Sequence, residues 1–416
     1  MSDPSKKSFD GQRRFRSHLT KSALLVIGAS AAGLLLTSVA LAIGSPTTPT
    51  GTRNPAASVV APTLWTTPQN EIGAPSIPTP GGAAEGAGAF DSIICPTASL
   101  CIAVGGDSNL SGTVATSSND GGAWSPGTVP AGLPEIKSVS CSSASHCVAV
   151  GSGVAIISSD GGATWSAHSI PTSNASLLGV SCPANTDTCV AVGVTPDVGG
   201  PLNGAIITSS DGGATWTAPT TKFPLAAIGG VSCASSTFCV AVGTQILVTG
   251  DAGQTWTQQF VDGGTGVLRT VSCSTSTSCV AIGVNPLGVD KSSSPGFEIQ
   301  TTDGGSKWSD VNLLAGSWLV NALSCSNTGD CVLSGPSPNA AATPAWTSSD
   351  GGSTWSTDAL PSTVSAVSSV SCYSASSCVY VGRSGANPIS GNYSSSAGWS
   401  NTPVSSIFLT TVGSPS

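Results

Sequence analysis

A fixed spacing between tryptophan and cysteine recurs along this chain and marks a repeating unit. In six consecutive cases a tryptophan is followed by a cysteine 17 residues later, from Trp124 and Cys141 to Trp355 and Cys372. The tryptophans themselves recur every 40 to 52 residues. Self-similarity at such a period is typical of repeat architectures, in which a unit buries its apolar faces only by packing on its neighbours.

Each tryptophan closes a short motif. SSDGGATW occurs at 158–165 and again, letter for letter, at 209–216. Two degenerate copies flank the clear ones, SSNDGGAW at 117–124, with Asn119 in the aspartate position, and SSSAGW at 394–399. The chain therefore contains seven repeats. The clear copies supply five aspartates and five tryptophans: Asp160, Asp211, Asp251, Asp303 and Asp350, with Trp165, Trp216, Trp256, Trp308 and Trp355.

Fourteen cysteines form seven close pairs, one in each repeat. The pairs are Cys95/Cys101, Cys141/Cys147, Cys182/Cys189, Cys233/Cys239, Cys273/Cys279, Cys325/Cys331 and Cys372/Cys378. Apolar runs such as SVSC and CVAVG, typical of short strands, flank each pair. Zinc binding would need C-x₂-C type spacing with four thiolates converging, which these wider pairs do not offer. We expect each pair to be a disulfide between two neighbouring antiparallel strands.

The variable part of the repeat lies between the second cysteine and the aspartate position, where the span ranges from 12 to 24 residues. Each repeat then consists of strand, cysteine hairpin, strand, variable loop, strand, turn and strand. Four-stranded antiparallel units repeated at this period predict an all-β fold, a β-propeller with seven blades over 90–404. How the ring closes stays open, because 405–412 could add an inner strand or remain loose.

The motif S-x-D-x-G-x-T-W is complete at 158–165, 209–216 and 348–355. In this the chain resembles the Asp-box propellers, named for the bacterial neuraminidase repeat and found in sialidases, sorting receptors and propellers similar to the photosystem II assembly factor. The resemblance implies a fold and no activity. The aspartate of such a turn accepts hydrogen bonds from its own backbone, and the tryptophan packs between blades. Since identical acids spread around a ring cannot converge on one substrate, we interpret them as structural.

The N-terminal part is typical of membrane targeting. Residues 1–21 carry six of the thirteen basic residues, and 22–43 are uncharged and mostly apolar. Such a run is long enough to span a bilayer, with 1–21 in the cytoplasm, so we expect a transmembrane signal anchor. The alternative is a cleaved signal peptide, because Ala40, Leu41 and Ala42 form an A-x-A site. Residues 44–89, rich in Pro, Thr, Gly and Ala, predict a disordered stalk, and 405–416 a short tail.

Charge and topology limit the function. From Gly44 onward the chain has 7 basic and 19 acidic residues, so the exported part carries a formal charge of −12 and nucleic acid is not an expected partner. Cysteine hairpins and aspartate turns share one face of an antiparallel propeller, and the variable loops lie on the other, where function is expected. Our candidate ligand-binding residues there and on the 17-residue connectors are Asp197, Asn203, Arg269, Asp290, Lys291, Trp318 and Arg383.

Two functions compete. The first is a sialidase or another glycoside hydrolase. A sialidase grips its substrate with three arginines, whereas the propeller region has only Arg269 and Arg383, although other glycosidases need only two carboxylates. The second is a non-catalytic propeller that binds a protein or a glycan, held at the membrane by 22–43, and we favour it. No cofactor or metal is expected. The longest loop, with Asp290 and Lys291, is expected to contribute to binding, with disorder as the alternative.

Overall fold

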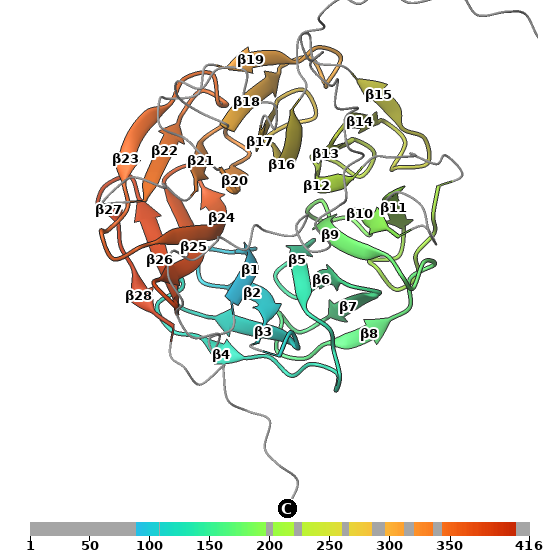
Figure 1. The fold of residues 1–416 in the computed structure, drawn as a ribbon, viewed down its shortest axis with the longest axis horizontal. Coiled ribbons are helices and arrows are strands. Elements are labelled where there is room, and N and C mark those ends of the chain that lie inside the picture. Colours follow the sequence, from blue (N-terminus) through green and yellow to red (C-terminus); the bar gives the residue numbers. More distant parts are fainter. Residues whose placement is uncertain are drawn as a thin grey trace, which may run out of the picture. The chain divides into compact units, whose positions relative to one another are not determined.

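The computed structural model describes residues 89–107, 109–196, 203–219, 227–259, 266–284, 296–311, 320–335 and 343–404. These residues contain strands and no helix, arranged as seven sheets around a common centre (Figure 1). The predicted seven-bladed propeller is confirmed. The stretches 1–21, 22–43, 44–88 and 405–416, and with them the predicted anchor, stalk and tail, lie outside the described residues. Within the described ranges no helix is long and apolar enough to cross a membrane.

Each blade is built from one continuous stretch of chain, with its first strand nearest the centre of the ring and its last strand on the outside (Figure 1). The first three blades contain the strands β1 (Ala89–Ile94), β2 (Cys101–Gly106), β3 (Gly112–Ser117) and β4 (Ser125–Pro126); β5 (Ile136–Cys141), β6 (Cys147–Gly151), β7 (Val154–Ser158) and β8 (Ser166–His168); and β9 (Ser176–Ser181), β10 (Cys189–Thr195) and β11 (Asn203–Ser209).

The next two blades follow the same order. They contain β12 (Ile228–Cys233), β13 (Cys239–Gly243), β14 (Ile246–Thr249) and β15 (Thr257–Gln259); and β16 (Val267–Cys273), β17 (Cys279–Val284), β18 (Gly296–Thr301) and β19 (Ser309–Val311).

Blades 6 and 7 complete the ring. They contain β20 (Ala322–Cys325), β21 (Cys331–Ser334), β22 (Pro344–Ser348) and β23 (Ser356–Ala359); and β24 (Ala366–Ser374), β25 (Ser377–Ser384), β26 (Asn387–Ser394), β27 (Gly398–Trp399) and β28 (Thr402–Pro403). In blade 7 the outer strand is split in two, since β27 and β28 both pair with β26.

The outer strands are the weakest part of each sheet. In blade 3 the expected fourth strand is reduced to a single bridge between Thr208 and Thr217. Pro219 follows closely, and a proline has no N–H to continue the ladder. Proline also ends the two-residue strand β4 at Pro126. The four-stranded blade is therefore the pattern of the ring, with proline shortening its outer edge.

The second strand of each blade, directly after the second cysteine, is almost entirely buried. Cys147–Gly151 has no exposed position, and the equivalent strand Cys239–Gly243 is the same. Runs of small and β-branched residues suit this place because both sheet faces are covered by neighbouring blades. The tryptophan of each turn packs on the preceding blade: Trp165 joins a core cluster with Ile102, Val104 and Val114 of blade 1.

The seven disulfides form as expected, each within its own blade and each joining the innermost strand to the next. In blade 2 the register pairs Cys141 directly with Cys147, and the Cα atoms of that disulfide are 4.0 Å apart. Among the described residues no cysteine is free. Seven disulfides indicate an oxidising compartment.

Among the described residues, blades 7 and 1 meet without exchange of a strand, while 405–412, which could add an inner strand, lies outside the described residues. The Cys95 N–H donates to Ser371 Oγ at 2.9 Å, and the Trp124 indole N–H donates to Ser390 Oγ at 2.9 Å. Apolar residues of both blades share one core cluster, in which Phe90 and Ile93 lie with Val379 and Val381 of blade 7. Blade 7 therefore meets blade 1 as any blade meets its neighbour.

Candidate functional site

The aspartate turns use their polar atoms internally. In blade 2 Ser158 Oγ donates to Asp160 Oδ1 at 2.8 Å, and the same carboxylate oxygen accepts from the Thr164 N–H at 2.9 Å. The Thr164 hydroxyl donates to Oδ2 at 2.6 Å. The Thr164 hydroxyl and N–H hold the pKa of Asp160 down at about 2. Both carboxylate oxygens are engaged within the turn, as expected of a structural residue.

The other turns repeat this geometry. Asp211, Asp251 and Asp350 each accept from the N–H and hydroxyl of a threonine four residues on. Asp303 accepts the Thr301 hydroxyl and the Lys307 N–H but no hydroxyl from position 307, because lysine stands there in place of the threonine. Gly162 has φ +89°, and a Cβ there would lie 2.9 Å from Thr116 Cγ2 of blade 1. Glycine thus lets the turn lie directly on the preceding blade.

Charged residues gather at bulges of the innermost strands. In six of these strands the register shifts at the residue four positions before the first cysteine. A bulge leaves one residue unpaired and changes the direction of its side chain. The six bulge residues are Asp91, Lys137, Leu178, Gly229, Arg269 and Ser368. Three of the six are charged in a chain that is only 8% charged.

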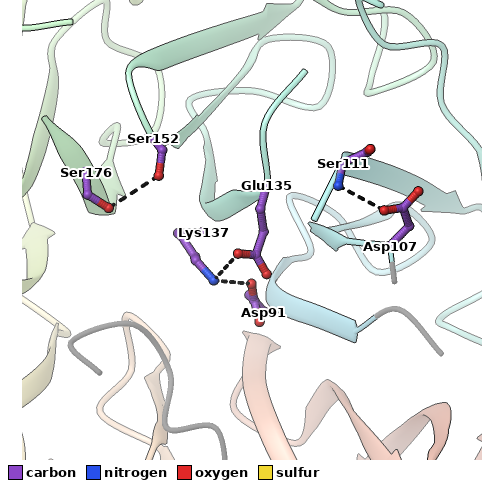
Figure 2. A network of polar contacts seen from close by, with 7 residues as sticks. All are labelled: Asp91, Asp107, Ser111, Glu135, Lys137, Ser152 and Ser176. Atoms are coloured by element: carbon purple, nitrogen blue, oxygen red, sulfur yellow. Dashed lines mark hydrogen bonds and ion pairs between the residues drawn. The ribbon is translucent and has the colours of Figure 1, made fainter. Parts of the chain in front are cut away.

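Asp91, Glu135 and Lys137 form an ion-pair network, which we call the axial cluster. Lys137 Nζ lies 3.2 Å from Asp91 Oδ2 and 2.7 Å from Glu135 Oε2. Figure 2 shows the amine between the two carboxylates, beside the inner strands β1 and β5. The side chains of Lys137 and Asp91 are 20% and 12% exposed. The cluster thus joins blade 1 to blade 2 and is still open to solvent.

Space for this cluster is made by a glycine. A Cβ at Gly106 would lie 2.8 Å from Glu135 Cγ, so a larger residue there would displace Glu135. Ala89 at the start of β1 pairs with Gly106, the last residue of β2 before the variable loop of blade 1. The axial cluster therefore lies near the end of the inner strands that borders the variable-loop face.

Burial and the ion pairs shift the pKa values of the axial cluster in opposite directions. Burial raises the pKa of Asp91 to about 6, although Lys137 lowers it. Burial also lowers the pKa of Lys137, but the carboxylates of Asp91 and Glu135 outweigh this and the net pKa is raised. Because both carboxylates contact one nitrogen at 3.2 and 2.7 Å, their nearest oxygens lie less than about 6 Å apart. Two acids at that distance could act on a glycosidic bond, but the Lys137 amine occupies the space between them.

The predicted binding residues fall into two groups. Asn203 begins β11 in blade 3, Arg269 is the bulge residue of β16 in blade 5, and Arg383 lies near the end of β25 in blade 7. All three border the predicted loop face, on three different blades. The other four, Asp197, Asp290, Lys291 and Trp318, lie outside the described residues.

Two acidic residues next to the variable loops have structural contacts. Asp107 closes its own turn, where Oδ1 accepts from the N–H groups of Asn109 and Ser111 at 2.8 and 2.9 Å. Glu298 is 1% exposed in the middle of β18. Its Oε1 accepts the Trp355 indole N–H at 2.9 Å, and its Oε2 is buried without a partner. Burial raises the pKa of Glu298 to about 8.

Sequence reasoning missed the axial cluster. Asp91 and Lys137 share a position, four residues before the first cysteine, with Arg269, which we did select. Counting back from every first cysteine would have found them. Among the described residues no group of three His, Cys, Asp or Glu side chains comes together that could hold a metal ion.

Comparison with known proteins supports the fold. No protein-family model matches the sequence, and no curated protein sequence matches it. Among solved structures, the GH74 xyloglucanase from Xanthomonas campestris is similar at a TM-score of 0.54 and 13% identity, covering 74% of this chain and 52% of that one. The WD40 repeats of RRP9 are similar at a TM-score of 0.53 and 10% identity, covering 72% and 88%.

A third similar structure is YCF48 bound to D1 peptide, at a TM-score of 0.47 and 18% identity, covering 64% of this chain and 80% of that one. The chain spans about half the length of the GH74 enzyme. At 13% and 10% identity, the likenesses to the GH74 enzyme and to the RRP9 repeats establish the fold alone.

Proposed function

We propose that this chain is an exported, non-catalytic propeller of the Asp-box kind that binds a protein or a glycan through its variable-loop face. The observation that carries the proposal is that loop variation and inner-strand charge concentrate on one face, whereas the aspartates of the other face form a repeated turn. On the turn face the aspartate oxygens accept hydrogen bonds from the backbone and the threonine hydroxyls of their own turns. On the loop face the chain places its longest variation and most of its inner-strand charge.

The cysteines bear on the location of the propeller. Seven disulfides support an oxidising compartment outside the cytoplasm. The apolar run 22–43 would hold it at the membrane, or 1–42 would be removed to release it. Asn203, Arg269 and Arg383 would contact the partner together with the axial cluster, and Asp197, Asp290, Lys291 and Trp318 would add to that surface.

The test is a binding screen with the full-length chain on a glycan array and in affinity capture from an extracellular extract. Arg383→Ala should weaken whichever interaction is found by at least fivefold. Lys307→Ala is the matched control, since it removes an exposed basic residue from the turn face. The proposal fails if Lys307→Ala weakens binding as much as Arg383→Ala.

A glycoside hydrolase is the second candidate, and the axial cluster is the observation in its favour. Two carboxylates less than about 6 Å apart, one with a pKa raised to about 6, resemble an acid pair of a retaining enzyme. Against this, Lys137 is bound between them. A panel of aryl glycosides and polysaccharides separates the two functions: turnover that Asp91→Asn and Glu135→Gln each abolish would make the chain an enzyme.

A further inference from the structure

The seventh blade lacks part of the turn that the other six have. In blade 6 the turn runs from Ser348 to Trp355, whereas in blade 7 Ser394 is followed by Trp399 only five residues later. The missing residues are those that would lie on the preceding blade. In blade 2, Gly162 of the complete turn lies on Ile102 and Thr116 of blade 1.

A cavity of about 210 Å³ lies between blades 6 and 7 at the corresponding place. Val332 and Thr347, which line it, occupy in blade 6 the positions of Ile102 and Thr116 in blade 1, one after the second cysteine and one before the turn serine.

The chemistry of the lining selects its ligand. Hydroxyl groups dominate, from Thr347, Ser349, Thr354, Ser356, Ser374 and Ser395. Among the described residues, the hydroxyls of Thr347, Ser349 and Ser356 have no protein partner, so they are able to donate and to accept. Asp330 is the one charged residue in the lining, and no cation accompanies it, which disfavours an anionic ligand.

Apolar surface completes the cavity. Tyr393 contributes an aromatic ring, held by packing on Trp399 with ring centroids 4.7 Å apart. Hydroxyl groups beside an aromatic ring match a sugar ring, which has hydroxyls on its edge and C–H groups on its faces. The cavity is smaller than the roughly 300–1,000 Å³ of sites for drug-sized ligands, so it has room for a single ring.

We propose that the cavity between blades 6 and 7 is a binding site for one neutral pyranose, either a free monosaccharide or the end of a glycan. The site lies on the turn face, opposite the loop face, and does not depend on the function proposed above. Asp330 and the free hydroxyls bond the sugar hydroxyls, and Tyr393 stacks on the ring.

The decisive variant restores the missing turn. Replacing 394–399, SSSAGW, by the SSDGGATW of 158–165 places a complete turn on Val332 and Thr347. Binding of the methyl glycosides of glucose, galactose, mannose and N-acetylglucosamine to the full-length chain is measured by saturation-transfer NMR and titration. We expect millimolar affinity for at least one of them and a loss of at least tenfold in the restored-turn variant.

Further variants keep the test decisive. Ala375→Trp, at an exposed position in the lining, blocks the cavity without changing the turn and should cause the same loss if the restored turn does not fold. Asn387→Ala, on the loop face, should leave sugar binding unchanged. An oligosaccharide that ends in the tightest-binding sugar is then compared with the methyl glycoside of that sugar. Equal or tighter binding indicates the end of a glycan, and weaker binding indicates a free monosaccharide. The proposal is overturned if no glycoside binds the wild type, or if Ala375→Trp binds as the wild type does.

Discussion

At the scale of single residues, the same turn position is filled by aspartate in five blades and by Asn119 in blade 1. Asn119 Oδ1 still accepts from the Ala123 N–H at 2.7 Å and from Ser117 Oγ at 2.9 Å. The geometry thus needs an oxygen at this place more than it needs a charge. Aspartate has a second acceptor oxygen where asparagine has an amide NH₂ group, and in blade 2 this oxygen accepts the Thr164 hydroxyl.

Asp160→Ala should lower the free energy of unfolding by about 1 to 2 kcal/mol, because the Thr164 N–H loses its acceptor. Asp160→Asn should cost clearly less. Denaturant titration at pH 7 measures both. Since the folded pKa of about 2 lies below the usual 3.8, the wild-type advantage over Asp160→Asn is present above pH 3.8 and is lost as the pH falls through 2. Equal costs for the two variants at pH 7 would contradict this account.

Glu298 stands where five of the other six blades have an apolar side chain facing the next tryptophan. The equivalent positions, three residues before the turn serine or threonine, hold Val114, Ala155, Ile206, Ile246 and Ala345, all buried. A neutral carboxyl fits there because it accepts the Trp355 N–H. The ionised form is penalised by burial.

Stability should therefore depend on pH through Glu298. Its folded pKa of about 8 lies above the usual 4.5, so its full contribution is present below pH 4.5 and is lost as the pH rises through 8. The slope should approach about 1.4 kcal/mol per pH unit between these values. Glu298→Gln should remove that slope in denaturation measured from pH 5 to 9. Asp358→Asn, at an exposed acid, should not change it.

At the scale of elements, the inner strands are joined across blades by serine hydroxyls. The residue before the first cysteine accepts the N–H of the first cysteine in the next blade: Ser181 accepts from Cys233 and Ser232 from Cys273, at 2.9 and 3.0 Å. The same contact occurs at six of the seven junctions. Between blades 1 and 2 the position is Ile94, which has no hydroxyl.

Ser181→Ala should destabilise the propeller by about 1 kcal/mol, because the Cys233 N–H is left without its partner at a partly buried site. Thermal and urea unfolding measure the change. Ser118→Ala, at an exposed serine, is the control and should stay within about 0.5 kcal/mol of the wild type. A neutral Ser181→Ala would mean that water replaces the hydroxyl at no cost.

Each disulfide closes a short hairpin. Replacing Cys141 and Cys147 by alanine should cost about 2 kcal/mol, since the loop closed is small and the entropy returned to the unfolded chain is limited. Intact-mass measurement with and without reductant should count seven bridges in the wild type and six in the variant. Bridges between blades, found by peptide mapping, would contradict the assignment.

At the scale of the whole molecule, blades 7 and 1 close the ring through hydrogen bonds and apolar contacts between the described residues. Removing blade 7 exposes the apolar surface of blade 1 around Phe90 and Ile93 and that of blade 6 around Ala322 and Val332. A chain ending at Leu360 should therefore fail to form a cooperative domain. A chain ending at Val404, which keeps every described strand, should unfold in one transition, as calorimetry and gel filtration would record. A folded, monomeric chain ending at Leu360 would refute ring closure as a condition of stability.

Most of the architecture could be predicted, because period, cysteine pairs and turns repeat seven times and each copy supports the others. The axial cluster could not be read as easily, since Asp91 and Lys137 meet only across two blades. The burial of Glu298 could not be predicted either, because glycine, proline and serine residues precede it and conceal where β18 begins. The cavity beside Tyr393 arises because the turn of blade 7 is shorter than the others. Its presence becomes clear only when the structures of the blades are compared.

Contiguous blades, each with its own disulfide, have a mechanical consequence. Under a pulling force on the two ends of the propeller, the junction between blades 7 and 1 carries the load first, and the described residues hold it by hydrogen bonds and apolar contacts. Once it parts, blades can unravel one at a time from either end. Each disulfide keeps the hairpin that it closes from extending, which shortens the unfolded length by about 20 Å per blade. The extension measured at rupture therefore reports the redox state of the protein.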